Sequence, residues 1–245
     1  MSILKPYYRI VRPLKQPMSF EYVLDSRYCQ ERSSLCKAYQ IIQQDLEKIF
    51  EYVEPCDNNC DNNKAVYSHR MFELLLRCAT EFEANCKGIL MANGYSSNSM
   101  NITDYSKLEQ ATKLSEYKVK LQYWYPHPLE LEPFKEWSKG YSLSWYKAYN
   151  QVKHNRNSNF DKSNLWNLIN ALAGLLCILY SQFEFQCANF YRTIESYSFN
   201  DGIIGLNGII FDIQPPQTWS DSEVYDFAWG SLKQLSYPYN KFNFI

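Results

Sequence analysis

Glycine and histidine are scarce in this chain, and their scarcity excludes several kinds of site. Only 8 of the 245 residues are glycine, and none of them forms the G-x-x-x-x-G-K or G-x-G-x-x-G pattern with which a backbone loop cradles phosphate groups. Three histidines leave little scope for a multi-histidine metal site, and neither H-E-x-x-H nor G-x-S-x-G occurs. The common signatures of P-loop enzymes, zinc peptidases and α/β-hydrolases are therefore lacking.

Excess charge and long apolar runs are also lacking. The formal net charge is -1 and the sequence pI is about 6.3, which argues against a globally basic nucleic-acid binder but leaves room for a local basic patch. Met1 to Arg12 contains no apolar h-region, so we expect a cytoplasmic protein. The most membrane-like run is 165–180, which is short for a span and is interrupted by Asn167 and Asn170. We expect it to be a buried helix and the protein to have no membrane partner.

Aromatic residues and cysteines are plentiful. The chain is 46% hydrophobic and 17% aromatic, which is ample material for a buried core. Its eight cysteines, in a long chain without a secretory signal, suggest reduced thiols. Cys56 and Cys60 form the only close pair in a loop. They could begin a zinc site, but no second Cys/His pair with suitable spacing follows, so we predict no metal and no cofactor.

The order of the predicted elements indicates a mainly α protein. Apolar periodicity and capping residues predict helices at 33–53, 63–92, 105–114, 144–155 and 161–191. A strand is predicted near 5–14, a strand or loop at 19–24, and a strand at 117–124. An Asn-Gly pair within 202–213 predicts a hairpin. We therefore expect one domain, 1–245: a helical bundle over about 31–193 with a small accessory sheet from the N-terminal, central and C-terminal segments.

Polar residues gather on one side of the 144–155 helix. Residues three or four apart share a helix face. Trp145, Tyr149 and Val152 should form the buried seam, while the other side should carry Tyr146 and a set of candidate site residues, Lys147, Asn150, Lys153 and His154. A cation, an amide and an imidazole at one helix end can hold a phosphate and move a proton, because histidine titrates near neutrality. The alternative is a structural one, in which His154 caps the carbonyls at the end of its helix.

These same residues carry a resemblance to a known family. SWYKAYNQVKHNR (144–156), FDKSNLWNLINALAGLLCIL (160–179) and SHRMFELLLRCATEFEANCKGIL (68–90) resemble an uncharacterised group of bacterial proteins related to HEPN domains. The resemblance covers about residues 64–190 and is clearest in YNQVKH. It implies a helical bundle that often dimerises. Many HEPN proteins are metal-independent ribonucleases, with an Arg, a short spacer and then a His as their signature.

The chain departs from that signature. His154 fills the histidine place, but the position before the spacer is Lys147, which keeps a positive charge without the bidentate fork of arginine. A ladder of His69, Glu73, Arg77 and Glu81 on the preceding helix has two interpretations. It is either a solvated face of ordinary i,i+4 pairs, or it places Arg77 and Glu81 across from His154, where Arg77 supplies the missing guanidinium.

Two functions from different classes follow. We expect a non-catalytic interaction or binding module, a homodimer that binds a protein partner or ligand, because the motif arginine is missing and the pI is acidic. The alternative is a metal-independent ribonuclease or RNA-binding protein of toxin–antitoxin or phage-defence type. In it, His154 would be the general base for a ribose 2′-hydroxyl, and Lys147, Lys153 and Arg77 would stabilise phosphate charge.

Overall fold

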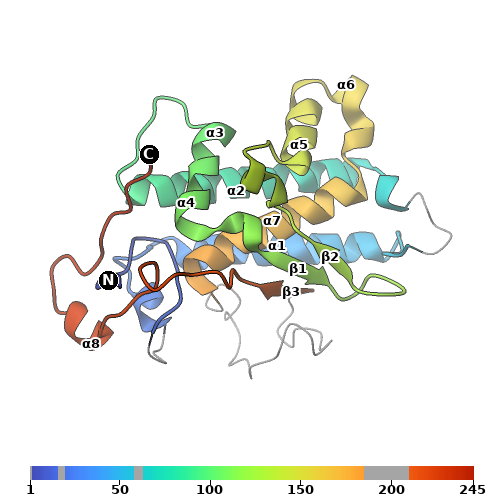
Figure 1. Cartoon of the computed structure of the whole chain (residues 1–245). Helices are drawn as coiled ribbons and strands as arrows, with labels where there is room; N and C mark the ends of the chain where they lie inside the picture. Colours follow the sequence, from blue (N-terminus) through green and yellow to red (C-terminus); the bar gives the residue numbers. More distant parts are fainter. Residues whose placement is uncertain (1, 16–19, 58–62, 185–209) are drawn as a thin grey trace.

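Three long helices lie side by side at the centre of the molecule. The structure, a computed structural model, describes residues 2–15, 20–57, 63–184 and 210–245. Helices α1 (Arg32–Phe50), α2 (His69–Ala92) and α7 (Leu165–Phe183) pack against one another, and the shorter α5 (Ser144–His154) packs on both α2 and α7 (Figure 1). The predicted mainly α bundle with a small accessory sheet is confirmed.

Short helical turns connect the long helices. They are the 3-10 helices η1 (Phe20–Leu24), η2 (Asn63–Ala65), η3 (Ser106–Leu108), η4 (Leu114–Glu116), η5 (Lys135–Lys139) and η6 (Phe160–Lys162), and the one-turn helices α3 (Ile102–Tyr105), α4 (Glu109–Thr112), α6 (Arg156–Asn159) and α8 (Trp229–Leu232). The single helix predicted at 105–114 is thus a run of separate turns from 102 onward. Its cap is Asn101, whose side chain accepts from the Thr103 N–H, while Asp104 completes the capping box as the residue at N3.

Local capping explains where two long helices begin. Helix α2 starts six residues later than predicted, because the Ser68 hydroxyl accepts from the Met71 N–H at 3.2 Å, and 63–65 is a separate turn. Helix α7 starts at 165 and not at 161, because the Asn164 side chain accepts from the Asn167 N–H at 3.0 Å. It ends at Phe183; the predicted extension over 185–191 lies outside the described residues.

The sheet has three antiparallel strands in the order β2–β1–β3 within the described part of the chain. Strand β1 (Lys118–Leu121) lies within the predicted 117–124 segment, β2 (Leu129–Leu131) follows it, and β3 (Phe211–Gln214) comes from the tail. Val119 pairs with Leu131 on one side and Ile213 on the other. The Asn207-Gly208 turn of the predicted hairpin lies outside the described residues.

The prediction that the N-terminal segment joins this sheet is wrong. Residues 2–15 instead form isolated bridges to the C-terminal segment, Ile3 and Leu14 to Tyr225 and Tyr7 to Asn240. Pro6 and Pro13 lack the N–H that a continuous ladder needs. The segment predicted as strand or loop at 19–24 is the 3-10 turn η1 over Phe20–Leu24.

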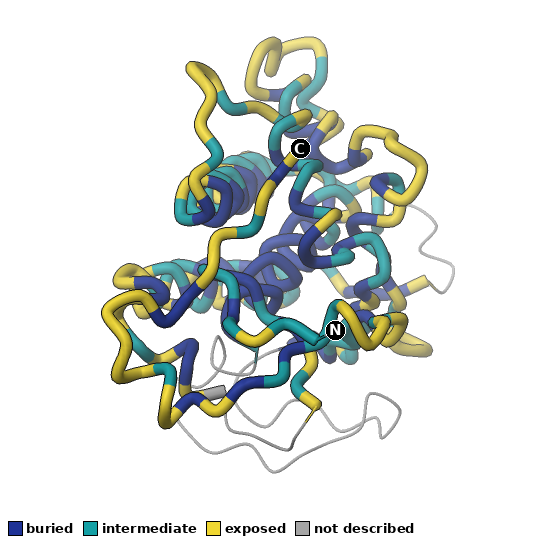
Figure 2. Tube along the Cα trace, turned by 60° about the vertical axis from the view of Figure 1, so that its left-hand side comes forward, coloured by how far each residue is buried: buried dark blue, intermediate teal, exposed yellow. Residues whose placement is uncertain are grey.

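Helix α7 is the central helix of the bundle. It is long and apolar enough to cross a membrane, but 83% of that apolar stretch is buried inside the protein, as predicted for a core helix. Helix α5 approaches α7 closely at Gly174, where an added Cβ would lie 3.1 Å from the Trp145 ring. Figure 2 shows this buried interior surrounded by exposed loops.

The two ends of the chain form a second packed layer, which we call the terminal region (residues 2–15, 20–30 and 224–245). In it the N-terminal and C-terminal segments run beside each other (Figure 1). Arg9, with a positive φ of 56°, sends its guanidinium into the bundle, where Nε donates to Gln182 Oε1 at 2.8 Å. The same group lies against α2 at Gly88, where an added Cβ would be only 2.1 Å from Nη1. The Tyr225 hydroxyl, fully buried, donates to the Ile10 carbonyl at 2.9 Å.

Candidate functional site

Helix α5 is held in place by its aromatic seam. Trp145, Ala148, Tyr149 and Val152 are buried, as the helical spacing predicts. Tyr146, expected on the opposite side, is buried as well, because its ring packs against Phe82 and Trp145. The Trp145 indole N–H donates to the Pro133 carbonyl at 3.0 Å, which anchors the start of the helix. Since this seam fixes the rotation of α5, it also decides which polar residues face solvent.

Lys147 and His154 do lie on one outward face of α5, with Asn150 between them. Lys147 and His154 are exposed and Asn150 is half-buried. Seven residues separate the lysine from the histidine, nearly two turns, so about 10 Å lies between them along the helix axis. The described cavities between α1 and α2 and beside β2 are lined by other residues. Lys147, Asn150 and His154 lie on an outward face of the helix.

Lys153 points to a different flank. Its ammonium donates to the Tyr149 hydroxyl at 2.9 Å and lies 5.0 Å from the centre of that ring. The hydrogen bond to Tyr149 raises the pKa of Lys153 above its ordinary value, despite a small opposing effect of burial. Neighbouring helical residues point about 100° apart, which is why Lys153 and His154 do not act on the same point.

The expectation that Arg77 and Glu81 face His154 is wrong for Arg77. Its guanidinium donates from Nη1 to Asp45 Oδ2 of α1 at 2.6 Å, and both Arg77 and Glu81 line a shallow hollow between α1 and α2. The Arg77–Glu81 part of the ladder therefore faces α1, whereas His69 at its start lies against Phe160. In the second interpretation, Arg77 would supply a guanidinium to α5. That interpretation fails because Arg77 lies on the side of α2 that faces α1.

The α2 carboxylate that does face α5 is Glu83, which the sequence reasoning missed. The Tyr146 hydroxyl donates to Glu83 Oε1 at 2.8 Å, and Lys87 lies 3.8 Å from the other oxygen. Burial and this hydrogen bond raise the pKa of Tyr146. Positions 81 and 83 point about 200° apart around a helix. Choosing Glu83 over Glu81 from the sequence would therefore require knowing how α2 is rotated about its axis relative to α5.

An aromatic cluster lies beyond the end of α5. The Phe160 ring sits 5.4 Å from Tyr67, 4.8 Å from His69 and 6.2 Å from Phe72, measured between ring centres. Arg156 places its guanidinium 5.5 Å from the centre of the Phe72 ring. Tyr67 is 49% exposed, so the cluster is open to solvent on one side. No periodic pattern marks Phe160, which stands alone between polar residues.

Together these residues form one surface, which we call the α5–α6 surface (Lys147, His154, Arg156, Phe160, Tyr67 and His69). Helices α5 and α6 stand at the upper right of the molecule, away from both chain ends (Figure 1). Residues 144–163 contain four cations, Lys147, Lys153, Arg156 and Lys162, and one acid, Asp161. Their sum is +3 (4 − 1) in a chain of net charge -1. Asp161 is engaged by Lys162 at 2.8 Å, so it does not oppose the others.

Metal binding receives no support from the described residues, among which no group of three or more His, Cys, Asp or Glu is arranged to hold an ion. Cys56 is buried, and the Asn63 amide lies 3.6 Å from its sulfur. Its predicted partner Cys60 lies outside the described residues. His154 lies in the last turn of α5, where a cation interacts favourably with the helix dipole, so the structural alternative for this residue is still a prediction.

Comparison with known proteins adds no relative. The chain matches no protein-family model, no curated protein and no solved structure. The resemblance to HEPN domains is therefore still a prediction, and the functional argument depends on the geometry alone.

Proposed function

We propose that this protein is a non-catalytic binding module of HEPN-like type, and that its α5–α6 surface holds single-stranded RNA. The observation that carries the proposal is the placement of exposed cations next to an open aromatic cluster. Single-stranded nucleic acid is bound by such combinations, in which cations follow the phosphates and bases stack on aromatic rings. Lys147 and Arg156 on this surface supply an attraction for phosphate that the chain as a whole, with its net charge of -1, does not.

The same geometry favours binding over cleavage. A general base must come within hydrogen-bond reach of the 2′-hydroxyl, with a cation on the same phosphate. Lys153 is directed to Tyr149 and Arg77 to Asp45. The remaining cations near His154 are Lys147, about 10 Å away along the helix, and Arg156, whose guanidinium lies against the Phe72 ring. Arg156 is engaged by an aromatic ring and Lys147 is set apart along the helix, so the geometry supports binding better than cleavage.

The binding surface is tested with a fluorescently labelled oligouridylate of about 12 nucleotides and anisotropy titrations at several salt concentrations. We expect Phe160→Leu to weaken binding by about 5- to 100-fold, the range for loss of one stacked base. Arg156→Gln should weaken binding and reduce the salt slope by about 0.7, as for one lost phosphate contact on a single strand. The matched control is Lys37→Gln, an exposed cation on α1, which should change neither quantity.

Two results would contradict the proposal. Equal weakening by Lys37→Gln and Arg156→Gln would mean that only total charge matters and that the α5–α6 surface is not the binding site. Cleavage of the oligonucleotide without metal, lost in His154→Ala, would show a ribonuclease in place of a non-catalytic module. Circular dichroism of each variant verifies that the helices are intact.

A further inference from the structure

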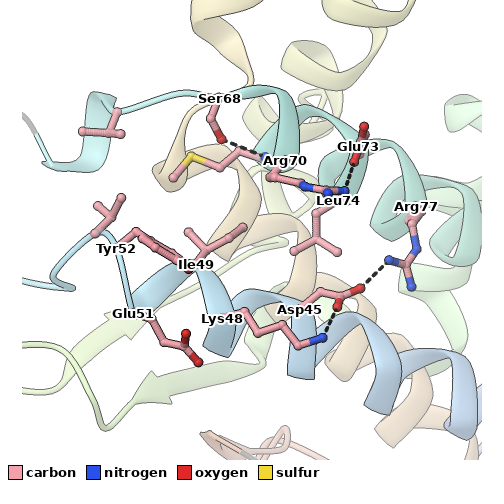
Figure 3. A pocket seen from close by; sticks show the side chains of 13 residues that line it. Asp45, Lys48, Ile49, Glu51, Tyr52, Ser68, Arg70, Glu73, Leu74 and Arg77 are labelled. Atoms are coloured by element: carbon pink, nitrogen blue, oxygen red, sulfur yellow. Dashed lines mark hydrogen bonds and ion pairs between the residues drawn. The ribbon is translucent and has the colours of Figure 1, made fainter.

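A cavity of about 600 Å³ lies between the C-terminal half of α1 and the N-terminal half of α2 (Figure 3). Its size is within the range of small-molecule sites in proteins. Its apolar lining consists of Ile49, Val53, Val66, Met71 and Leu74. Met71 and Leu74 are buried, whereas Val53 and Val66 are partly open, so the cavity has an apolar floor and an accessible mouth.

The charged residues around this cavity are unevenly distributed. At one end, Asp45 accepts from both Arg77 at 2.6 Å and Lys48 at 3.0 Å. Two cations on one carboxylate leave a local charge of about +1. The hydrogen bond from Arg77 lowers the pKa of Asp45; burial opposes this effect, and the hydrogen bond from Lys48 lowers the pKa further. This end is therefore positive.

Over the whole lining, three cations (Lys48, Arg70 and Arg77) and three acids (Asp45, Glu51 and Glu73) sum to zero, so the positive charge is confined to the Asp45–Lys48–Arg77 end. Arg70 and Glu73 pair with each other at 3.0 Å above the cavity, and Glu51 lies at the opposite end, next to Tyr52 (Figure 3). Within the described residues, Arg77 uses only one of its guanidinium nitrogens, Nη1, for Asp45. A guanidinium presents several donors in a fixed plane, so Arg77 can hold Asp45 and still offer donors to an oxygen anion.

We infer that this cavity binds a small amphipathic anion, with an apolar body on the Ile49–Leu74 floor and one carboxylate or sulfonate group at Arg77. The floor supplies the burial and the Asp45–Lys48–Arg77 end supplies the charge complementarity. This site is separate from the α5–α6 surface and does not depend on RNA binding, because Arg77 and Glu81 face α1 and not α5.

The probe for the test is 8-anilinonaphthalene-1-sulfonate, an anion with an apolar aromatic body, titrated into the folded full chain by isothermal calorimetry. We expect one saturable site per chain. Arg77→Gln should weaken binding about tenfold, as for loss of a charge-assisted hydrogen bond. Val53→Trp, which adds bulk at the mouth without removing charge, should also weaken it. N-phenyl-1-naphthylamine, a similar molecule without the sulfonate, should bind Arg77→Gln and the unchanged protein equally well.

Arg156→Gln is the matched control, since it removes a guanidinium at the α5–α6 surface. It should bind the sulfonate normally, and Arg77→Gln should bind the oligouridylate normally, so the two proposals fail separately. The inference is overturned if the folded protein shows no saturable sulfonate binding. It is also overturned if neither Arg77→Gln nor Val53→Trp weakens that binding, because the probe would then occupy another surface. Urea unfolding of both variants excludes loss of the fold as the cause.

Discussion

The helical bundle and the terminal region are both deeply buried, but their polar groups find partners in different ways. In α7 the backbone groups bond within the helix, and its central side chains, from Ala171 to Leu176, are almost fully apolar and buried. In the terminal region regular ladders are short, and tyrosine hydroxyls bond to main-chain carbonyls, as Tyr225 does to Ile10 and Tyr239 to Tyr22. One layer is stabilised mainly by apolar contact, the other by apolar contact plus a set of specific hydrogen bonds.

This difference teaches that aromatic content alone does not define a core. Phe82 in α2 contacts a group of rings from other elements: Tyr105, Phe134, Trp137, Trp145 and Tyr146. Tyr22 contacts a comparable group in the terminal region: Tyr28, Tyr225, Phe227 and Trp229. The bundle should therefore be most sensitive to lost volume, and the terminal region should also respond to the loss of single hydroxyl groups.

The largest effect is expected from Phe82→Ala. Phe82 is fully buried, and its removal leaves a cavity among five rings. We expect the free energy of unfolding to fall by about 3–5 kcal/mol, measured by urea denaturation with far-UV circular dichroism. The control is Tyr52→Ala, at an 86% exposed position of the same bundle, which should change stability by less than about 0.5 kcal/mol. Similar losses from both variants would contradict the packing argument.

A smaller effect is expected from Tyr225→Phe, which removes one oxygen and little volume. The hydroxyl donates to the Ile10 carbonyl and accepts from the Tyr7 N–H at 3.0 Å. Their loss leaves buried polar groups without partners and should reduce the unfolding free energy by about 1–3 kcal/mol. Tyr237→Phe, at a 78% exposed position, should have no measurable effect. If Tyr225→Phe left the unfolding free energy unchanged, the proposed difference between the bundle and the terminal region would be contradicted.

The smallest effect concerns pH and Glu223, which immediately precedes the C-terminal part of the terminal region and pairs with Lys113 at 3.1 Å. Burial alone would raise the pKa of Glu223, but hydrogen bonds from Ser220 and Lys113 outweigh it and lower the pKa from 4.5 to about 2. The charged form is thus favoured in the folded state. Its contribution is fully present above pH 4.5 and is lost as the pH falls toward 2.

We therefore expect Glu223→Gln to be less stable than the unchanged protein at pH 7 by under about 1 kcal/mol, since the group is partly exposed. The difference should shrink as the pH is lowered from 4.5 toward 2, measured by urea unfolding at several pH values. A difference that stays constant down to pH 2.5 would show that the Glu223 carboxylate does not contribute through its charge. Asp221→Asn, an exposed neighbour, is the control.

The helices were predictable because each carries a repeated apolar stripe over several turns. Leu74, Cys78 and Phe82 in α2 are buried as their spacing indicates. The ends of helices were less predictable, because Asn101 and Asp104 are both favourable N-cap residues. The structure shows that Asn101 has the extended backbone of the cap. The N-terminal segment was misjudged because β-branched and aromatic residues suit a strand, whereas its partners at 224–240 are more than 200 residues away.

For the site, the sequence placed Lys147 and His154 on one face but did not reveal what stands opposite. Which flank of α2 meets α5 depends on packing between helices. It brings Glu83 to Tyr146 and sends Arg77 to Asp45. Phe160 was not identified because a solitary aromatic residue in a polar turn has no periodic signal. Contacts between segments that are distant in the sequence cannot be inferred from the pattern of one segment alone.

The contact between Arg9 and Gly88 constrains how this sequence can drift during evolution. A methyl group at position 88 would overlap a guanidinium that is itself buried and bonded to Gln182. Homologous chains that acquire a side chain at 88 should therefore carry a shorter residue at 9, and chains that keep arginine at 9 should keep glycine at 88. Positions 9 and 88, which are 79 residues apart (88 − 9), are therefore expected to be substituted together.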